Sequence, residues 1–217
     1  GTELVSNGGT ANYTSLTTGG AIDLTSLAYV AGATASVNGP GLLTVSAGGQ
    51  SYTEQLAGNY AGSTFFAVQD DSIGTLVIDA SAVYSVTDGQ TAIGLGLGQG
   101  DFAEVFSGGT TISTTVSSGG YETVSSGGTA SFTTVSHGGT EVVSSGGTTV
   151  STTVSYGGTE YAFSGGTANF ITVSYGGTEA VSNAGTTNYT TVNFGGAEYV
   201  FSCGTANFIT ISNGGFE

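Results

Sequence analysis

Pairs of small residues, most of them Gly-Gly, recur through the second half of this chain at spacings that alternate between 8 and 11 residues. The first members of these pairs are Gly108, Gly119, Gly127, Gly138, Gly146, Gly157, Gly165, Gly176, Ala184, Gly195, Cys203 and Gly214. The two spacings together make a 19-residue period, which is too short for a domain. A period of about 20 residues is typical of proteins in which one unit cannot bury its apolar face alone and stacks on its neighbours.

Positions one period apart carry similar side chains, and a column of glutamates marks the repeat. The other columns are Val124, Val143, Ala162, Val181 and Val200 (two residues after each glutamate), Thr133, Thr152, Ile171, Thr190 and Ile209 (eleven after), and Val135, Val154, Val173, Val192 and Ile211 (thirteen after). Positions two apart on a strand share a face, so we assign the last two columns to the inside. Glycine supplies the positive φ that sharp corners need. Each unit therefore predicts one coil of an all-β, parallel β-solenoid.

The repeat divides the chain into three parts. We expect regular 19-residue coils over residues 84–217 and one further coil over residues 1–20, where Gly8 and Gly19 fit the same pattern. Over residues 21–83, which include Pro40, the pattern blurs. There we expect degenerate or loop-bearing coils, with a small β insert as the alternative. Both ends of the chain fall inside a repeat unit, so we also expect either a part of a longer array or a processed mature product.

Charge limits the classes of partner. The chain has no Lys or Arg and 15 Asp and Glu, which gives a formal net charge of −15. Binding of nucleic acid depends on Lys and Arg, so it is disfavoured, as is binding to anionic membrane surfaces. No apolar run is long enough to span a membrane. The single cysteine, Cys203, occupies a glycine position of the repeat, and we interpret it as sequence drift.

The repeats resemble those of a known family. Residues 124–135 (VSSGGTASFTTV) and 167–179 (TANFITVSYGGTE) are similar to the 19-residue repeats of AIDA-type autotransporter adhesins. The likeness covers residues 84–217 and 1–20. It implies a right-handed parallel β-helix, secreted or displayed on the bacterial cell surface, that mediates adhesion to a host or polysaccharide surface or self-association. It also implies O-glycosylation of Ser and Thr in the repeats.

The glutamate column is the most unusual set of candidate functional residues, and it comprises Glu122, Glu141, Glu160, Glu179 and Glu198. Stacked like charges destabilise a sheet. One interpretation is a solvated acidic edge that discourages lateral aggregation. The other is a row of weak Ca²⁺ sites, because carboxylates are good calcium ligands. We expect mild acid or millimolar Ca²⁺ to raise the melting temperature.

Aromatic columns are the second candidate. Alternation along the strand places Phe132, Phe170, Tyr189 and Phe208 on the outside, and a corner column holds His137, Tyr156, Tyr175 and Phe194. Such ladders can reinforce the stacking of coils. An exposed apolar strip is otherwise a contact surface, here for a second copy or for carbohydrate. An inward assignment that is wrong by one residue would instead make these aromatics the core.

The sequence gives little support to catalysis. His137 has no visible base partner, and Asp70, Asp71, Asp79 and Asp101 are the only candidates for a glycosidase-type carboxylate pair. We therefore expect no catalytic residue and no cofactor other than weakly bound Ca²⁺. The predicted function is an adhesin or self-association segment. The first alternative is a structural filament or spacer that stacks end to end, and a distant one is a polysaccharide-acting enzyme.

Overall fold

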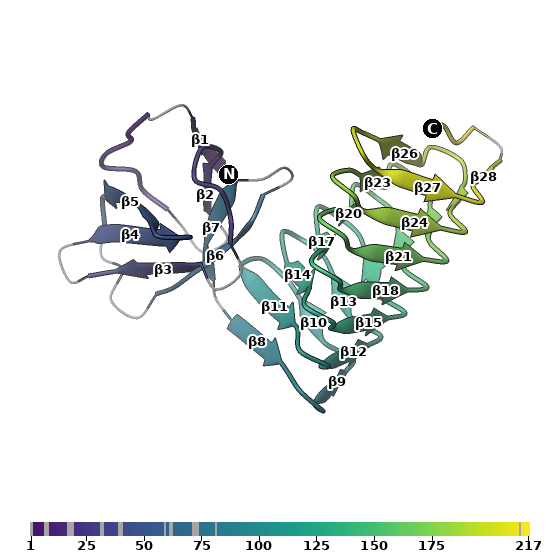
Figure 1. Cartoon of the computed structure of the whole chain (residues 1–217), viewed down its shortest axis with the longest axis horizontal. Coiled ribbons are helices and arrows are strands. Elements are labelled where there is room, and N and C mark those ends of the chain that lie inside the picture. Colours follow the sequence, from purple (N-terminus) through teal and green to yellow (C-terminus); the bar gives the residue numbers. More distant parts are fainter. Residues whose placement is uncertain are drawn as a thin grey trace. The chain divides into compact units, whose positions relative to one another are not determined.

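A computed structural model describes residues 2–6, 9–16, 20–30, 33–38, 41–58, 60, 63–70, 74–80, 82–212 and 214–217. Its regular elements are all strands, and these described residues contain no helix long and apolar enough to cross a membrane. The chain forms two compact units, Gly1–Ser81 and Ala82–Glu217, which we describe separately (Figure 1). Gly8, Gly19, Pro40 and Asp71 lie outside the described residues.

The C-terminal unit is a β-solenoid built from three parallel sheets, each of seven strands. The glutamate sheet contains β8 (Ala82–Val86), β11 (Asp101–Val105), β14 (Tyr121–Val124), β17 (Thr140–Val143), β20 (Thr159–Ala162), β23 (Thr178–Val181) and β26 (Ala197–Val200). The threonine sheet contains β9 (Thr91–Ile93), β12 (Thr110–Ile112), β15 (Thr129–Ser131), β18 (Thr148–Val150), β21 (Thr167–Asn169), β24 (Thr186–Asn188) and β27 (Thr205–Asn207). The valine sheet contains β10 (Gly96–Leu97), β13 (Thr115–Val116), β16 (Thr134–Val135), β19 (Thr153–Val154), β22 (Thr172–Val173), β25 (Thr191–Val192) and β28 (Thr210–Ile211).

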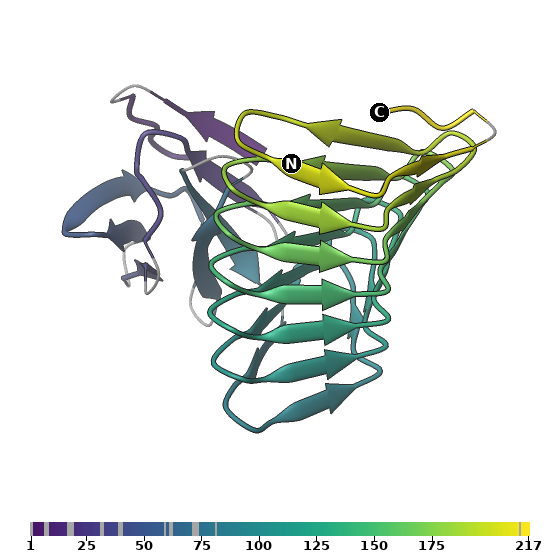
Figure 2. The same cartoon turned by 45° about the vertical axis from the view of Figure 1, so that its right-hand side comes forward.

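Every strand pair in these three sheets has the same 19-residue register. Val135 lies beside Val154, and Val154 lies beside Val173, on successive coils. The predicted 19-residue coil is therefore confirmed, and Figure 2 shows the coils stacked along one axis. The side chains of these three valines are fully buried, so the inward assignment of the valine column is confirmed as well.

The two glycines of each Gly-Gly corner have different roles. Gly127 has a φ of 85°, and a Cβ there would meet nothing within 4 Å. At Gly128 a Cβ would lie 2.2 Å from the carbonyl oxygen of Val105 on the preceding coil, closer than any real contact. The first position thus needs a left-handed backbone, and the second needs the absence of a side chain. This explains why Ala184 and Cys203 replace only first glycines, since both have a positive φ and are followed by Gly.

The N-terminal unit has a different sheet topology. Its four-stranded sheet has the order β1 (Thr2–Val5), β2 (Ala21–Leu24), β7 (Thr75–Ala80), β6 (Thr64–Gln69), and only β1 and β2 are parallel. A three-stranded antiparallel sheet contains β3 (Thr34–Val37), β4 (Leu42–Ala47) and β5 (Gln50–Gln55). Fully buried side chains of this unit include Ile22, Leu43, Val45 and Val77.

The expectation of continued coils over residues 21–83 is wrong for the described residues of that span. Among the described residues of this unit, only the pairing of β1 with β2, from Thr2 beside Ala21 to Val5 beside Leu24, keeps the 19-residue offset. From there to residue 80 every ladder is antiparallel, and the Gly48-Gly49 turn folds β4 directly back along β5. Two-residue glycine turns favour hairpins.

Candidate functional site

The five glutamates of the column lie inside the solenoid. Glu122, Glu141, Glu160, Glu179 and Glu198 each have a relative exposure of 0 %. The predicted solvated acidic edge is therefore wrong. The physical reason is alternation, because Val124, Val143, Ala162 and Val181, which follow the first four glutamates by two residues and share their face, are fully buried. The alternation is visible in the sequence, although the cost of burying a charge favours a solvated position.

Threonine hydroxyls provide hydrogen bonds to the buried carboxyls. Thr111 Oγ1 donates to Glu122 Oε1 (2.7 Å), and Thr149 Oγ1 donates to Glu160 Oε1 at the same distance (2.7 Å). The remaining contacts are Thr114 and Thr133 to Glu122 (3.2 and 3.4 Å), Thr152 to Glu141 (3.1 Å) and Thr187 to Glu198 (2.9 Å). All of these donors are hydroxyls, and none carries the positive charge that would balance a carboxylate.

Burial raises the pKa of every glutamate in the column. The pKa of Glu160 is raised to about 7, chiefly because its carboxyl is removed from water. Burial raises the pKa of Glu141 and Glu179 well above the usual range, and the neighbouring glutamate Glu160 raises both further. For Glu122 and Glu198 burial also raises the pKa, against threonine hydrogen bonds that lower it. The shift toward the neutral form is therefore largest for Glu141 and Glu179.

The candidate Ca²⁺ ladder has few of the ligands that calcium needs. Calcium takes six to eight oxygen ligands. Among the described residues, no group of three or more His, Cys, Asp and Glu side chains is arranged to hold a metal ion. The glutamates are spread along the axis at the spacing of neighbouring strands, about 4.8 Å, with one carboxyl on each coil.

The first aromatic ladder (Phe170, Tyr189 and Phe208) lies at the corner between the threonine and valine sheets. The rings of Phe170 and Tyr189 stack with centroids 5.1 Å apart, and those of Tyr189 and Phe208 stack at 4.8 Å. The three side chains are 55, 50 and 70 % exposed, and Phe132 in the same column is 62 % exposed. The predicted outward orientation is confirmed. Because each ring face covers the next, the ladder presents mainly ring edges to solvent.

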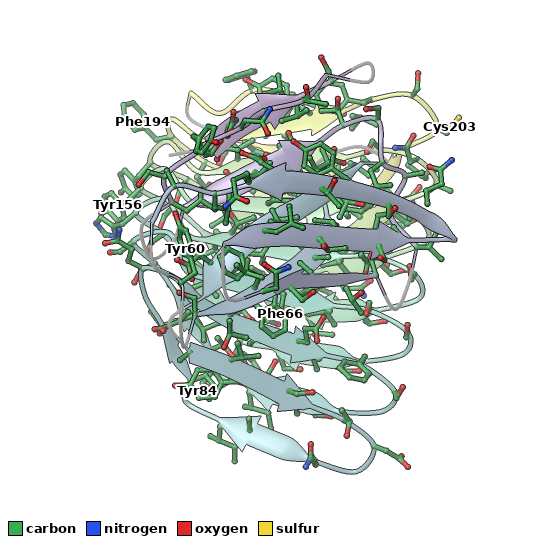
Figure 3. All side chains as sticks on the ribbon, turned by 90° about the vertical axis from the view of Figure 1, so that its left-hand side faces the viewer. Tyr60, Phe66, Tyr84, Tyr156, Phe194 and Cys203 are labelled. Carbon is green, nitrogen blue, oxygen red and sulfur yellow. The ribbon has the colours of Figure 1, made fainter. Side chains whose placement is uncertain are left out.

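The second aromatic ladder (His137, Tyr156, Tyr175 and Phe194) follows the valine sheet. His137 stacks on Tyr156 (5.4 Å between centroids), and Tyr156 stacks on Tyr175 (5.5 Å). Phe194 is tilted by 58° from Tyr175. Tyr156, Tyr175 and Phe194 are all more than half exposed, as predicted, and Figure 3 shows Tyr156 and Phe194 projecting from one side of the solenoid.

A shallow groove runs beside the first ladder. It has a volume of about 320 Å³ and is lined by its three rings together with Ile171 and the outward threonines Thr172, Thr191 and Thr210. Both ring edges and hydroxyls are therefore available to a partner in one place. The three residues of the first ladder have a positive φ of 58–60°, which is strained for a residue with a Cβ.

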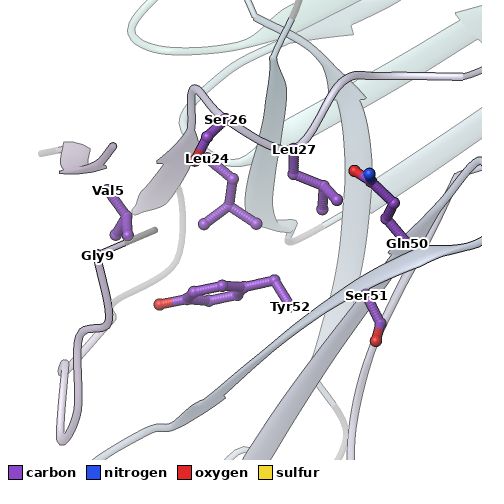
Figure 4. Close-up of a pocket in the computed structure, with 8 residues that line it drawn as sticks. All are labelled: Val5, Gly9, Leu24, Ser26, Leu27, Gln50, Ser51 and Tyr52. Atoms are coloured by element: carbon purple, nitrogen blue, oxygen red, sulfur yellow. The ribbon is translucent and has the colours of Figure 1, made fainter. Parts of the chain in front are cut away.

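A second hollow, in the N-terminal unit, has a volume of about 430 Å³. Leu24 and Leu27 point into it from the end of β2 and the turn that follows, and Tyr52 points into it from β5 (Figure 4). The Tyr52 hydroxyl donates to Glu54 Oε2 (3.0 Å) and accepts from the backbone N–H of Ala11 (3.3 Å). Burial raises the pKa of Tyr52 to about 12. Its lining residues are otherwise neutral, and no motif in the sequence indicated it.

The carboxylates considered for catalysis have structural roles. Asp70 accepts a hydrogen bond from the backbone N–H of Gly74 (2.8 Å), and Asp101 accepts one from Gly98 (2.9 Å). Both therefore stabilise turns. Asp79 is buried, and burial raises its pKa. The ring of His137 is part of the second ladder, and its Nδ1 lies 3.1 Å from the hydroxyl of the adjacent Ser136.

Together these features define a parallel β-solenoid with a carboxyl column inside and aromatic ladders outside. Its 19-residue coil fits the resemblance to AIDA-type passenger repeats. No protein-family model matches the chain, and no curated protein matches it. A solved structure similar to it is the TibC-catalysed hyper-glycosylated TibA55-350 fragment, with 34 % sequence identity and a TM-score of 0.46. The match covers 62 % of this chain and 59 % of that fragment.

Proposed function

We propose that the solenoid is an adhesin segment, exposed at a bacterial surface, that acts through repeated side-chain ladders. The observation that carries this proposal is the exposure of two aromatic ladders along one stack of coils, each made of rings that stack from coil to coil. Contiguous exposed apolar surface of this kind marks interaction sites. Aromatic side chains also contribute large contact areas with little loss of conformational entropy.

The partner that we favour is a second copy of the same chain. Stacking of a sugar needs a free ring face, and within the first ladder neighbouring rings cover both faces of Tyr189 and one face each of Phe170 and Phe208. Ring edges can instead pack against the exposed rings and threonines of another solenoid. Two such chains repel each other, because each has a formal net charge of −15. Self-association should therefore strengthen when salt screens the charges.

The test replaces the first ladder with Ser, using the variant Phe170→Ser, Tyr189→Ser, Phe208→Ser. Ser113 and Ser151 occupy this column naturally with a positive φ, so the backbone tolerates the change. Analytical ultracentrifugation across a salt series should show self-association at least ~10-fold weaker than in the unchanged chain, as expected for loss of an aromatic anchor. The matched control is Thr148→Ser on the threonine sheet, which should associate normally. Self-association of the ladder variant as strong as that of the unchanged chain would overturn the proposal.

The first alternative, a spacer that stacks end to end, is separated by electron microscopy of the same samples. Fibres one solenoid wide that persist in the ladder variant would favour the spacer. Lateral clusters that disappear in that variant would favour adhesion through the ladders.

We also propose that outward threonines of the valine sheet are sites of O-glycosylation. This column consists of Thr115, Thr134, Thr153, Thr172, Thr191 and Thr210. Its members are exposed or half-buried, so a glycosyltransferase could reach the hydroxyls. The support is the family resemblance together with this accessibility. Intact mass of native material should exceed the sequence mass by multiples of one sugar residue, and an unmodified mass would contradict it.

A further inference from the structure

We propose that the glutamate column is a row of alternating acids and carboxylates, in which Glu141 and Glu179 hold protons that neighbouring glutamates accept. The solenoid would then bind protons as it folds and lose stability as the pH rises. The inference rests on four features of the interior: complete burial, the absence of cations, an alternation of Thr and Ala, and carboxyl oxygens without donors.

Burial without cations is the first step. All five carboxyls are fully buried, and the chain contains no Lys or Arg that could balance their charge. Five ionised carboxylates spaced about 4.8 Å apart in a dry interior would repel one another strongly. A buried carboxyl in this situation takes up a proton in preference to remaining charged.

An alternation in the threonine sheet shows which glutamates are neutral. Its strands place one inward side chain eleven residues before each glutamate, and these side chains are Thr111, Ala130, Thr149, Ala168 and Thr187 in turn. The three threonines each donate a hydrogen bond to their glutamate. The two alanines cannot. Glu141 therefore keeps the hydrogen bond from Thr152 to its Oε2, with Oε1 unpartnered, and Glu179 has no donor at either oxygen.

Glu179 is the clearest case. Ala168 lies eleven residues before it and Ile171 lies eight before it, so neither position supplies a hydroxyl. Neither of its carboxyl oxygens has a donor, although the side chain is fully buried. Its hydrogen-bonding neighbour is another carboxyl, that of Glu160. Two carboxylates cannot hydrogen-bond, so the contact forms when a proton from solvent converts Glu179 to the acid, whose O–H donates to Glu160.

Among the described residues, no positively charged group lies near the column to neutralise the carboxylates. The threonine sheet presents Thr or Ala, and the corner before the valine sheet presents Thr114, Thr133, Thr152, Ile171 and Thr190. On β11 the position next to Glu122 is Ala103. At the other end the further titratable group is Glu217, an acid that acts on Glu198. The column is thus surrounded by neutral side chains and by its own members.

The direction of the pH dependence follows from the folded-state pKa values, which lie above the usual value of 4.5. The folded chain then holds more protons than the unfolded chain between pH 4.5 and at least about 7, the pKa of Glu160. The stability contributed by the neutral column is therefore complete below about pH 4.5. It is lost as the pH rises through 7 and above.

The test combines thermal melting with infrared spectroscopy on the whole chain. The melting temperature should fall by ~10 °C or more between about pH 5 and about pH 8. The double variant Glu141→Gln, Glu179→Gln keeps the size and the hydrogen-bond donor but needs no proton, so its melting temperature should change much less. An exposed-site control, Asp88→Asn, should retain the full pH dependence.

Infrared spectra separate the alternating pattern from a general effect of charge. At neutral pH the unchanged chain should show the carbonyl band of protonated carboxylic acid. The Glu141→Gln, Glu179→Gln variant should lose most of this band, whereas the matched variant Glu122→Gln, Glu160→Gln should keep it. Absence of the band in the unchanged chain, or equal loss in the two variants, would overturn the proposal.

The remaining alternative for the unpartnered oxygens is a bound cation. Melting at about pH 8 with millimolar Ca²⁺, with Na⁺ or K⁺ alone, and with chelator distinguishes the two. The proton account predicts the same melting temperature in each at equal ionic strength. A specific increase with one cation that disappears in the Glu141→Gln, Glu179→Gln variant would show that the ion, and not the proton, neutralises the column.

Discussion

The two units of this chain give buried acids different partners. In the N-terminal unit Glu54 accepts from Tyr52, and Asp70 accepts from the backbone of Gly74. In the solenoid each side chain has copies of itself as neighbours, because every coil repeats the pattern of the coil before it. Aromatic rings and amides tolerate such neighbours, since rings stack and an amide both donates and accepts. A carboxylate tolerates them only when protons are shared.

The largest expected effect separates the glycines of one corner. A Cβ on Gly147 would lie 2.1 Å from the carbonyl oxygen of Val124, so Gly147→Ala should destabilise the solenoid by more than ~3 kcal/mol through backbone displacement. Gly146→Ala introduces only a strained φ and should cost ~1 kcal/mol. In the N-terminal unit Gly49, which also has open space around it, should resemble Gly146. Denaturant unfolding measures all three, and equal costs at Gly146 and Gly147 would contradict the packing role.

The next prediction compares the donors of buried acids in the two units. Tyr52→Phe leaves Glu54 without its tyrosine partner, and Thr149→Ala leaves Glu160 Oε1 without a donor. Each substitution should lower the free energy of unfolding by ~1–3 kcal/mol at neutral pH. The cost of Thr149→Ala should shrink in acid, where Glu160 is protonated. Thr149→Ser restores the hydroxyl and serves as its control, and a loss that is independent of pH would argue against the link to Glu160.

A smaller effect is expected in the amide ladder of the threonine sheet. Asn207 donates to Asn188 (3.1 Å), and Asn188 donates to Asn169 (3.0 Å). Asn188→Ser breaks both side-chain bonds and should cost ~1–2 kcal/mol. Ser131 occupies this column naturally, so the backbone should be undisturbed. Unchanged thermal melting would mean that the ladder contributes nothing to stability.

The smallest effect concerns the glycine position held by Cys203. Its φ is 61°, so Cys203→Gly should stabilise the solenoid by less than ~1 kcal/mol by removing strain. Cys203→Ser keeps the strain and should leave the melting temperature unchanged. An equal gain in both variants would attribute the effect to removal of the thiol.

How far the sequence predicts this molecule differs between the two units. In the solenoid, periodicity alone gives the coil and the inward position of Val135 and Val154, because each coil is positioned by its copies. The same alternation rule places Glu122 inside with Val124, whereas the cost of burying a charge predicts the outside. Over residues 21–80 there is no period to follow, although Gly48-Gly49 between alternating strands is a hairpin signal.

The hollow of the N-terminal unit illustrates what sequence cannot supply. Val5, Leu24 and Tyr52 line it from three segments of the chain that no repeat relates. Their approach depends on the antiparallel pairing of several strands. The protonation pattern of the solenoid can be predicted from the sequence only in part. Its residues are visible in the repeat, but the strand register is needed to show that Thr149 and Ala168 face successive glutamates.

The most direct test of the 19-residue coil is disulfide cross-linking in a Cys203→Ser background. Thr134 and Thr153 pair on adjacent strands, so cysteines at these positions should have Cα atoms ~4.8 Å apart, within disulfide range. Thr134 and Thr172 lie two coils apart, about twice that distance, and cysteines there should remain free. Oxidation followed by mass spectrometry should find the 134–153 bond in the monomer and no 134–172 bond. Efficient 134–172 cross-linking, or none at 134–153, would contradict the stacked coil.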